Sequence, residues 1–270
     1  MIALEKLLNK NNENKFICVG LDTDLEKIPE VIKSSKNPIY DFNKAIIEAT
    51  KDYAASYKLN FAFYESEGLE GLKALEETLS LIPVDILTIG DAKRGDIGNT
   101  SSMYAKAIFD KLNFDAITLH PYMGFDSLSP FIEYQDKLNF ILALTSNPGA
   151  NDFEKLKLSS GEYLYQTVIA EVNKWNKYIN CGIVFGATKL DELKENIKRF
   201  LDLPVLLPGV GAQGGSLEDV VSTFKQAGRK NYLVNISRGI IYKSSSNDFA
   251  EKAHEEIIFL NKKVEDILLS

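Results

Sequence analysis

Eight short apolar runs, each followed by a longer amphipathic segment, constrain the fold more than any other feature of this sequence. The runs begin near Phe16, Ser56, Asp85, Asp115, Asn139, Cys181, Pro204 and Asn231. Short apolar runs that alternate with helical segments indicate parallel strands joined by helices. Eight such units are what a closed barrel requires, whereas an open doubly wound sheet usually has fewer. The sequence therefore predicts an α/β fold, a single-domain (β/α)8 TIM barrel.

The segments between the runs support one domain over residues 1–270. Helices are expected over Asp41–Tyr53, Leu69–Leu81, Asn99–Lys111 and Leu217–Ala227. The units are not sequence repeats, and no linker rich in Pro, Gly or Ser marks a domain boundary. Two further helices, an extra N-terminal one over Ile2–Leu8 and a last one over Asp248–Leu268, are expected to pack on the outside of the barrel. The longest irregular piece, Asn147–Gly161, is a loop that could cover a site.

Charge and cysteine content exclude several classes of partner. The chain of 270 residues has a net charge of −7 and no long basic tract, which argues against nucleic acid or an acidic membrane as the main partner. Cys18 and Cys181 lie in apolar, strand-like runs and are expected to be buried thiols rather than a disulfide. No apolar run is long enough to span a membrane and no signal peptide is recognisable, so a cytoplasmic protein is expected.

Notable polar residues fall at the C-terminal ends of the predicted strands. They are Asp22 after the first strand, Asp91 and Lys93 after the third, Ser146 after the fifth, Gly209–Gly211 after the seventh and Ser237–Gly239 after the eighth. In a barrel these ends share one rim, and active sites are built on that rim. Scattered surface charges would not gather there, so the rim is the expected site.

The glycine-rich segment after the seventh strand predicts a phosphate site. Glycines let backbone N–H groups approach a phosphate closely, and Gly209, Gly211 and Gly214 match G-x-G-x-x-G. A dinucleotide-binding fold carries that fingerprint early and places an acidic residue about 20 positions later. Here the match is late and Arg229–Lys243 contains no Asp or Glu, so we reject that fold.

Arg238, after the eighth strand, strengthens the prediction of a phosphate site. In barrels, the loops after strands seven and eight often bind phosphate, and a guanidinium supplies a bidentate donor pair. The glycines alone could simply form tight turns, but that alternative does not account for the arginine.

Two lysines and a carboxylate mark the chemical end of the rim. Lys58 alternates with apolar neighbours on the second strand, so it is expected to point toward the barrel interior and to pair with Asp91 on the adjacent strand. A purely structural ion pair is the alternative. Lys93 could form a Schiff base, but that needs a neutral amine, and carboxylates favour the ammonium form. At about 4 Å and an effective dielectric near 20, one such pair is worth about 4 kcal/mol. Lys93, between Asp91 and Asp96 in the sequence, is thus expected to act as a proton donor.

No metal site is expected. No pair of histidines or cysteines has metal-ligand spacing. Asp91 and Asp96 could bind Mg²⁺ through oxygen, but Lys93 between them neutralises part of their charge. His120, at the end of the fourth strand, could be a general base or a structural histidine, and it is left out of the mechanism.

The segment Asp91–Thr100 resembles the orotidine 5′-phosphate decarboxylase family, whose Asp-x-Lys-x-x-Asp core is intact here. The resemblance runs over nearly the whole length, from Gly20–Asp22 to Ser237–Gly239. Arg94 and Gly95 make the segment similar to the longer bacterial subgroup. The resemblance implies cofactor-independent decarboxylation of orotidine 5′-phosphate to uridine 5′-phosphate, a step of pyrimidine biosynthesis.

The same resemblance implies roles for the residues nearest the reaction. Asp22 is expected to bind the ribose hydroxyls, and Lys58 to contact the ribose and Asp91. Asp91 is expected beside the substrate carboxylate. Lys93 is expected to protonate C6 as carbon dioxide leaves.

Further roles implied by the resemblance concern the neighbouring subunit, the base and the phosphate. Asp96 and Thr100 are expected to reach the ribose of the substrate in a neighbouring subunit, which implies a homodimer with shared sites. Ser146 is expected to hydrogen-bond the pyrimidine. The residues expected at the phosphate are Gly211, Gln213, Gly214 and Arg238.

Two other functions stay open at this point. A sugar-phosphate decarboxylase or aldolase of the same barrel superfamily would use the same frame with Mg²⁺ to stabilise an enediolate, so activity in a chelator would exclude it. A non-catalytic, nucleotide-binding barrel would bind uridine monophosphate without turnover.

Overall fold

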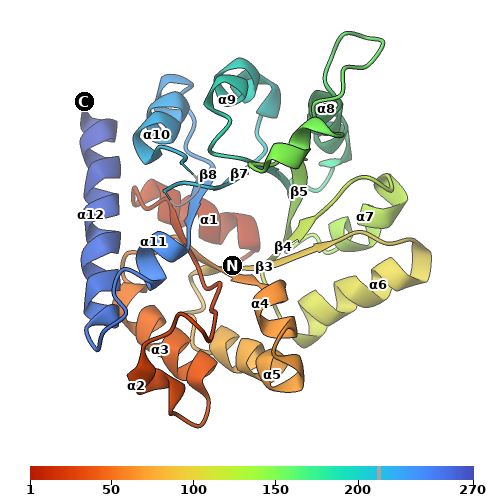
Figure 1. The fold of residues 1–270 in the computed structure, drawn as a ribbon. Helices are drawn as coiled ribbons and strands as arrows, with labels where there is room; N and C mark the ends of the chain where they lie inside the picture. The colour runs from red at the N-terminus through yellow and green to blue at the C-terminus, as the bar shows by residue number, and fades with distance from the viewer. Residues whose placement is uncertain (212–213) are drawn as a thin grey trace.

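The computed structural model describes residues 1–211 and 214–270 and contains a closed barrel of eight parallel strands in the order β1 to β8 (Figure 1). The strands are β1 (Ile17–Gly20), β2 (Ser56–Asn60), β3 (Leu87–Arg94), β4 (Ala116–Leu119), β5 (Leu138–Leu144), β6 (Cys181–Phe185), β7 (Val205–Pro208) and β8 (Tyr232–Ile236). Each begins within 2 residues of the predicted start. The predicted single-domain TIM barrel is therefore confirmed.

One helix, α1 (Ala3–Asn12), precedes the first strand. The other helices follow the strands and form a ring outside the sheet (Figure 1). They are α2 (Glu30–Lys33), α3 (Pro38–Thr50), α4 (Phe61–Glu65), α5 (Gly68–Leu79), α6 (Gly98–Lys106), α7 (Phe125–Ile132), α8 (Leu164–Trp175), α9 (Leu190–Asn196), α10 (Leu217–Gln226), α11 (Arg238–Ile241) and α12 (Phe249–Leu269). A π-helix continues α6 over Ala107–Lys111, and 3-10 helices cover Pro148–Asn151 and Ile197–Phe200.

The helix bounds follow from local chemistry. α3 begins three residues before the predicted Asp41, because the Asn37 side chain accepts the Tyr40 N–H (3.4 Å) and Pro38 occupies the first helical position. The predicted helix Asn99–Lys111 exists, but its last five residues are π-helical. The predicted loop after β5 contains the 3-10 helix Pro148–Asn151.

Two hydrophobic cores hold the fold together. The larger core lies between the strands and the surrounding helices. The smaller core fills the barrel interior with side chains from the strands, including Leu87, Ile89, Phe140 and Leu233. Because β-strand side chains alternate, Asp91 continues the interior-facing row of Leu87 and Ile89. This parity brings the carboxylate to the barrel mouth.

The prediction that the first helix packs outside the barrel is wrong. Ala3 and Leu7 of α1 belong to the interior core, and α1 lies across the barrel centre in Figure 1. Lys6 pairs with Asp115 (2.7 Å), the residue that immediately precedes β4 in the sequence, so the helix closes the N-terminal end of the barrel. Periodicity shows that a helix has an apolar face but does not show which surface that face covers. The last helix, α12, packs outside against α3 and α10, as predicted.

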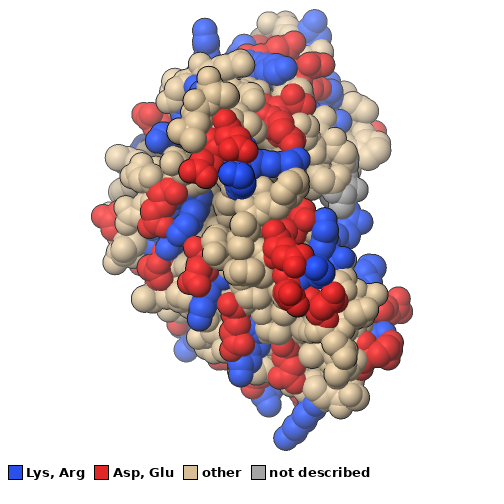
Figure 2. All heavy atoms as spheres, turned by 90° about the vertical axis from the view of Figure 1, so that its left-hand side faces the viewer, with Lys and Arg blue, Asp and Glu red and all other residues tan. Residues whose placement is uncertain are grey.

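The surface carries both signs of charge. Figure 2 shows acidic and basic side chains interleaved over the face that contains α12. Ion pairs such as Lys243–Glu256 (2.6 Å) and Lys263–Glu218 (2.6 Å) join α12 to neighbouring elements. In the part of the chain that the structure describes, no helix is long and apolar enough to cross a membrane.

Candidate active site

A cavity of about 290 Å³ lies at the C-terminal rim of the barrel. Its lining includes six residues predicted for the site: Asp22, Lys58, Asp91, Lys93, Ser146 and Arg238. These six come from loops and strand ends spread over 217 positions of sequence, from residue 22 to residue 238. The barrel rim brings them together because all strands are parallel and their C-terminal ends coincide.

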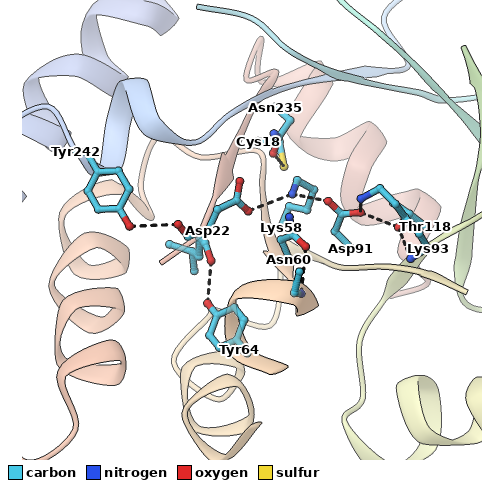
Figure 3. A network of polar contacts seen from close by, with 12 residues as sticks. Cys18, Asp22, Lys58, Asn60, Tyr64, Asp91, Lys93, Thr118, Asn235 and Tyr242 are labelled. Carbon is cyan, nitrogen blue, oxygen red and sulfur yellow. Dashed lines mark hydrogen bonds and ion pairs between the residues drawn. The ribbon is translucent and has the colours of Figure 1, made fainter. Parts of the chain in front are cut away.

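Four charged side chains of opposite sign alternate across the cavity (Figure 3). Lys58 Nζ donates to Asp22 Oδ1 (3.3 Å) and to Asp91 Oδ2 (2.8 Å). Lys93 Nζ donates to the other oxygen, Asp91 Oδ1 (2.6 Å). The predicted pair of Lys58 and Asp91 is thus confirmed, and Asp91 holds one ammonium group on each carboxylate oxygen.

Burial differs along this row of charges. The side chains of Lys58 and Asp91 are 5% and 9% exposed, whereas that of Lys93 is 49% exposed. Lys58 and Asp91 are therefore fixed by their surroundings. Lys93 instead reaches over the cavity with an amine that water can approach.

The electrostatic effects of this arrangement keep Lys58 and Asp91 charged. Burial alone would lower the pKa of Lys58, but the Asp22 and Asp91 carboxylates outweigh burial and raise that pKa above its ordinary value. Burial alone would raise the pKa of Asp91, but the charges of Lys58 and Lys93 hold that pKa well below its ordinary value. Lys93 Nζ donates to Asp91 Oδ1 (2.6 Å), and the Schiff-base alternative would require the amine to leave this ion pair.

The end of β3 is irregular where it carries Lys93. The register against β4 shifts between Gly90 and Arg94, so residues 91–93 stand opposite Thr118 alone. Lys93 has a φ of 46°, a left-handed conformation that is uncommon for residues with a side chain. In a regular strand, Lys93 would point to the same face as Asp91. The bulge interrupts this alternation, but Lys93 Nζ still reaches Asp91 Oδ1 (2.6 Å).

Asp96 and Thr100 do not line the cavity of their own chain. Asp96 Oδ1 accepts the Ile97 N–H (2.8 Å), and no ion pair joins Asp96 to Lys93 within the described ranges. The expectation that both acidic neighbours surround Lys93 therefore holds only for Asp91 in a single chain. Thr100 is exposed, as are Ile97 and Met103 beside it.

Only some of the residues expected at the phosphate line the cavity. Arg238 lines it, and no carboxylate of residues 1–211 and 214–270 pairs with this guanidinium. Gly211 and Gly214 do not line the cavity. Both have positive φ (74° and 90°). Their N–H groups donate to carbonyls within the loop, to Gly215 (2.9 Å) and Gly211 (2.8 Å). Gln213 lies outside the described residues.

The segment after β5 supports the cavity wall. Ser146 and Asn147 line the cavity. Glu154 accepts the Thr145 N–H (2.6 Å) and the Thr145 hydroxyl (2.8 Å), which holds this segment against the end of β5. The loop predicted over residues 147–161 therefore contributes one lining residue and a support.

Comparison with known proteins identifies the family of this chain. The sequence model described as "Orotidine 5′-phosphate decarboxylase / HUMPS family" matches residues 15–253. A relative from Christiangramia forsetii, named orotidine 5′-phosphate decarboxylase, is 51% identical over 252 residues, covering 92% of this chain and 91% of its own. The chain belongs to this family.

Solved structures agree with the family and the fold. The Leishmania donovani OMP decarboxylase has a TM-score of 0.85 and 35% sequence identity, with 100% of each chain covered. The orotidine 5′-monophosphate decarboxylase from Methanocaldococcus jannaschii, solved with the inhibitor BMP, has a TM-score of 0.66 and 25% identity over 92% of this chain and 99% of that chain.

Several lining residues of this family member escaped the sequence analysis. The polar ones are Asn60, Thr118, Thr145, Asn147 and Asn235, and an apolar wall is formed by Leu142, Val184 and Leu206. Strand parity could have found two of them, because Thr118 and Asn235 are single polar residues between apolar neighbours, like Lys58. The others depend on which loop and strand faces meet at the mouth.

Three further residues considered from the sequence, His120, Cys18 and Cys181, do not line the cavity. The backbone N–H of His120 donates to the Arg94 carbonyl (3.0 Å). Cys18 and Cys181 are buried free thiols, as predicted. Burial raises the pKa of each thiol to about 12, so both stay protonated.

Proposed function

We propose that the chain decarboxylates orotidine 5′-phosphate to uridine 5′-phosphate in pyrimidine biosynthesis, without a cofactor, with Lys93 as the proton donor. The observation that carries this proposal is the buried Asp91 carboxylate, which holds the Lys58 ammonium on one oxygen (2.8 Å) and the Lys93 ammonium on the other (2.6 Å) at the cavity. A cation is thereby set where negative charge develops.

The proposed step moves one electron pair and one proton. The bond between C6 and the carboxyl carbon breaks, carbon dioxide leaves, and the electron pair stays on C6. A proton from Lys93 Nζ then forms the C6–H bond, and the half-exposed amine regains a proton from water. The preplaced ammonium stabilises the developing carbanion, and it needs no reorganisation at that moment.

Contacts away from C6 supply the rest of the stabilisation in this proposal. One charge pair contributes only a few kcal/mol, too little for the whole barrier. Arg238 and Gln213 bind the phosphate, and the glycine loop of Gly211 and Gly214 closes over it. That distant binding energy holds a closed, dry site whose benefit appears in the transition state.

The remaining contacts complete the substrate site. Asp22 binds the ribose hydroxyls, Lys58 also contacts the ribose, and Ser146 hydrogen-bonds the pyrimidine. These three residues line the same cavity. They lie near the C-terminal ends of β1, β2 and β5.

A homodimer with shared sites is the second part of the proposal. Asp96 and Thr100 lie outside their own cavity, in a segment with the exposed apolar side chains Ile97 and Met103. A second copy of the chain would cover those side chains and receive Asp96 and Thr100 at the ribose of its substrate.

We also assign the protein to the cytoplasm, because its two buried cysteines are free thiols.

Ultraviolet monitoring of orotidine 5′-phosphate in the presence of EDTA tests the proposed reaction. We expect steady conversion to uridine 5′-phosphate at the same rate with and without chelator. Lys93→Ala should abolish turnover while leaving binding of uridine monophosphate measurable, and Lys51→Ala, at an exposed lysine outside the cavity, should behave like the wild type.

Other outcomes would contradict the proposed reaction or the role of Lys93. Loss of activity in EDTA would favour the Mg²⁺-dependent sugar-phosphate enzyme. Tight binding of uridine monophosphate without any turnover would favour the non-catalytic barrel. Retained activity in Lys93→Ala would remove the proton-donor role.

A further inference from the structure

The backbone of Lys93 is held in a conformation that needs support. Its φ of 46° is left-handed and costs free energy for a residue with a side chain. The register shift of β3 against β4 leaves residues 91–93 opposite one residue, Thr118. The regular ladder therefore does not hold this stretch, and another group must do so.

The Thr118 hydroxyl is that group. It accepts the backbone N–H of Lys93 (3.1 Å) and lies 2.8 Å from Asp91 Oδ1 (Figure 3). A hydroxyl has one hydrogen, and a backbone N–H can only donate, so the hydroxyl hydrogen is donated to the carboxylate. Thr118 is 2% exposed, which protects both bonds from water.

These bonds tie both ends of Lys93 to one carboxylate. The Lys93 ammonium donates to Asp91 Oδ1 (2.6 Å), and the Lys93 backbone reaches the same oxygen through the Thr118 hydroxyl. Lys93 is 49% exposed at its side chain, so packing does not fix its four flexible bonds. The Asp91 ion pair and the backbone anchor are the contacts that direct the amine.

We infer that Thr118 is a positioning residue for the reaction: its hydroxyl locks the bulge of β3 so that the Lys93 ammonium points at the substrate. This inference rests on the proposed proton-donor role of Lys93. A catalytic group displaced by about 1 Å can lose about a hundredfold in rate. Thr118 acts through Lys93 and Asp91.

Thr88 offers a matched control for the plain alternative, a buried threonine that only satisfies its own hydroxyl. The Thr88 hydroxyl donates to Asp115 Oδ2 (3.0 Å) and accepts the Asp115 N–H (3.0 Å). A threonine hydroxyl thus again accepts one backbone N–H and donates to one carboxylate, here between β3 and the residue that precedes β4. Thr88 does not line the cavity.

The experiment compares kcat and KM for orotidine 5′-phosphate in Thr118→Val, Thr118→Ala, Thr118→Ser and Thr88→Val. We expect Thr118→Val and Thr118→Ala to lower kcat about 10- to 100-fold, while KM and the Kd for uridine monophosphate change less than about threefold. Thr118→Ser keeps the hydroxyl and should restore kcat to within about threefold of the wild type. Thr88→Val should leave kcat unchanged.

The comparison of alanine with serine at position 118 decides the question even if the valine variant is unstable, because those two side chains differ by one oxygen. Equal kcat in Thr118→Ala and Thr118→Ser would overturn the inference, as would an equal loss in Thr88→Val. In both cases the proposed function would stand, since the wild type turns over. An inactive wild type would instead overturn the proposed function and this inference with it.

Discussion

Asp91 is the residue on which the chemistry of the rim depends. Its two oxygens receive Lys58, Lys93 and Thr118, and its side chain is 9% exposed. A buried carboxylate needs such partners, because an unpaired one would lose its hydration without compensation. The two ammonium groups balance the two carboxylates Asp22 and Asp91, so the guanidinium of Arg238 is the added positive charge of the cavity lining.

The low pKa of Asp91 makes a prediction about stability. A carboxylate whose pKa is lower in the folded state stabilises that state above its unfolded pKa, about 3.9. This contribution is lost as the pH falls through the folded value. Removing one partner of a buried pair costs about 3–5 kcal/mol. Asp91→Asn should therefore lower the free energy of unfolding by that amount at pH 7, and by progressively less below about pH 4.

Urea unfolding of both proteins at pH 7, 5 and 3.5 measures this difference. Lys58 does not affect this comparison. Because the pKa of Lys58 is raised in the folded state, its contribution to the free energy of unfolding is complete below its unfolded pKa of about 10.4. That contribution is lost only as the pH rises through the folded pKa. Asp52→Asn, at an exposed carboxylate, is the control and should unfold like the wild type. A difference between Asp91→Asn and the wild type that is independent of pH would contradict the charge assignment.

Arg238 makes a prediction about substrate recognition. Charge-assisted hydrogen bonds contribute about 1.5–3 kcal/mol, so Arg238→Ala should lower kcat/KM for orotidine 5′-phosphate about 10- to 100-fold. The same change should barely affect a substrate analogue without the phosphate. Arg199→Ala, which breaks a surface pair with Glu162, is the control. Steady-state kinetics with both substrates measure the effect, and equal losses would exclude Arg238 from the phosphate site.

At the scale of elements, the connection from β3 to α6 leads the chain from Lys93 to Asp96. Arg94 pairs with Glu65 (2.7 Å) at the end of α4, and its guanidinium lies over the rings of Phe61 (5.6 Å) and Tyr104 (5.1 Å). One side chain thereby joins α4, the end of β3 and α6. It fixes the path of the chain toward Asp96.

Gly95 is required by the same path. A methyl group at this position would lie 2.8 Å from the His120 carbonyl oxygen. Gly95→Ala should therefore shift the connection, lower stability by about 1–3 kcal/mol and lower kcat as well. Thermal unfolding and kinetics of the same variant measure both effects.

Gly68→Ala is the matched control for backbone strain alone. Gly68 has a φ of 62°, but a methyl group there would meet no atom within 4 Å. It should lower stability by about 1 kcal/mol and leave kcat unchanged. If Gly95→Ala kept full activity, the path of this connection would not matter to the site.

At the scale of the whole molecule, the two ends of the barrel differ: α1 packs against one end, and the cavity lies at the other. α1 closes the N-terminal end with its apolar face and the Lys6–Asp115 pair. The cavity with its charged row occupies the C-terminal end. The mouth is completed in our proposal by a second copy of the chain, which explains why Asp96 lies outside its own cavity.

Mixing inactive chains tests this shared site. Asp91→Ala disables the site of its own chain, and Asp96→Ala disables the site of its neighbour. A mixed dimer then contains one intact site, so random mixing should restore about a quarter of wild-type activity. Asp91→Ala mixed with Lys93→Ala should restore none, because both residues serve the same chain's site. Failure to restore activity, with mixed dimers shown to form, would refute sharing.

The sequence by itself determined the order of strands and helices, the barrel class and six of the lining residues. Periodicity and strand parity are local properties, and the eight strand starts and the Lys58–Asp91 pair follow from them. The single polar residue Thr118 carried the same signal, but its partners were not visible in the sequence.

Only the tertiary structure decided where α1 packs, how β3 bulges at Lys93 and that Thr118 supports the bulge. Each of these depends on contacts between distant residues, such as Lys6 with Asp115 and Lys93 with Thr118. An apolar helix face or a buried hydroxyl satisfies its physical requirements against any suitable partner. The closed barrel selects that partner when it brings the strand ends together.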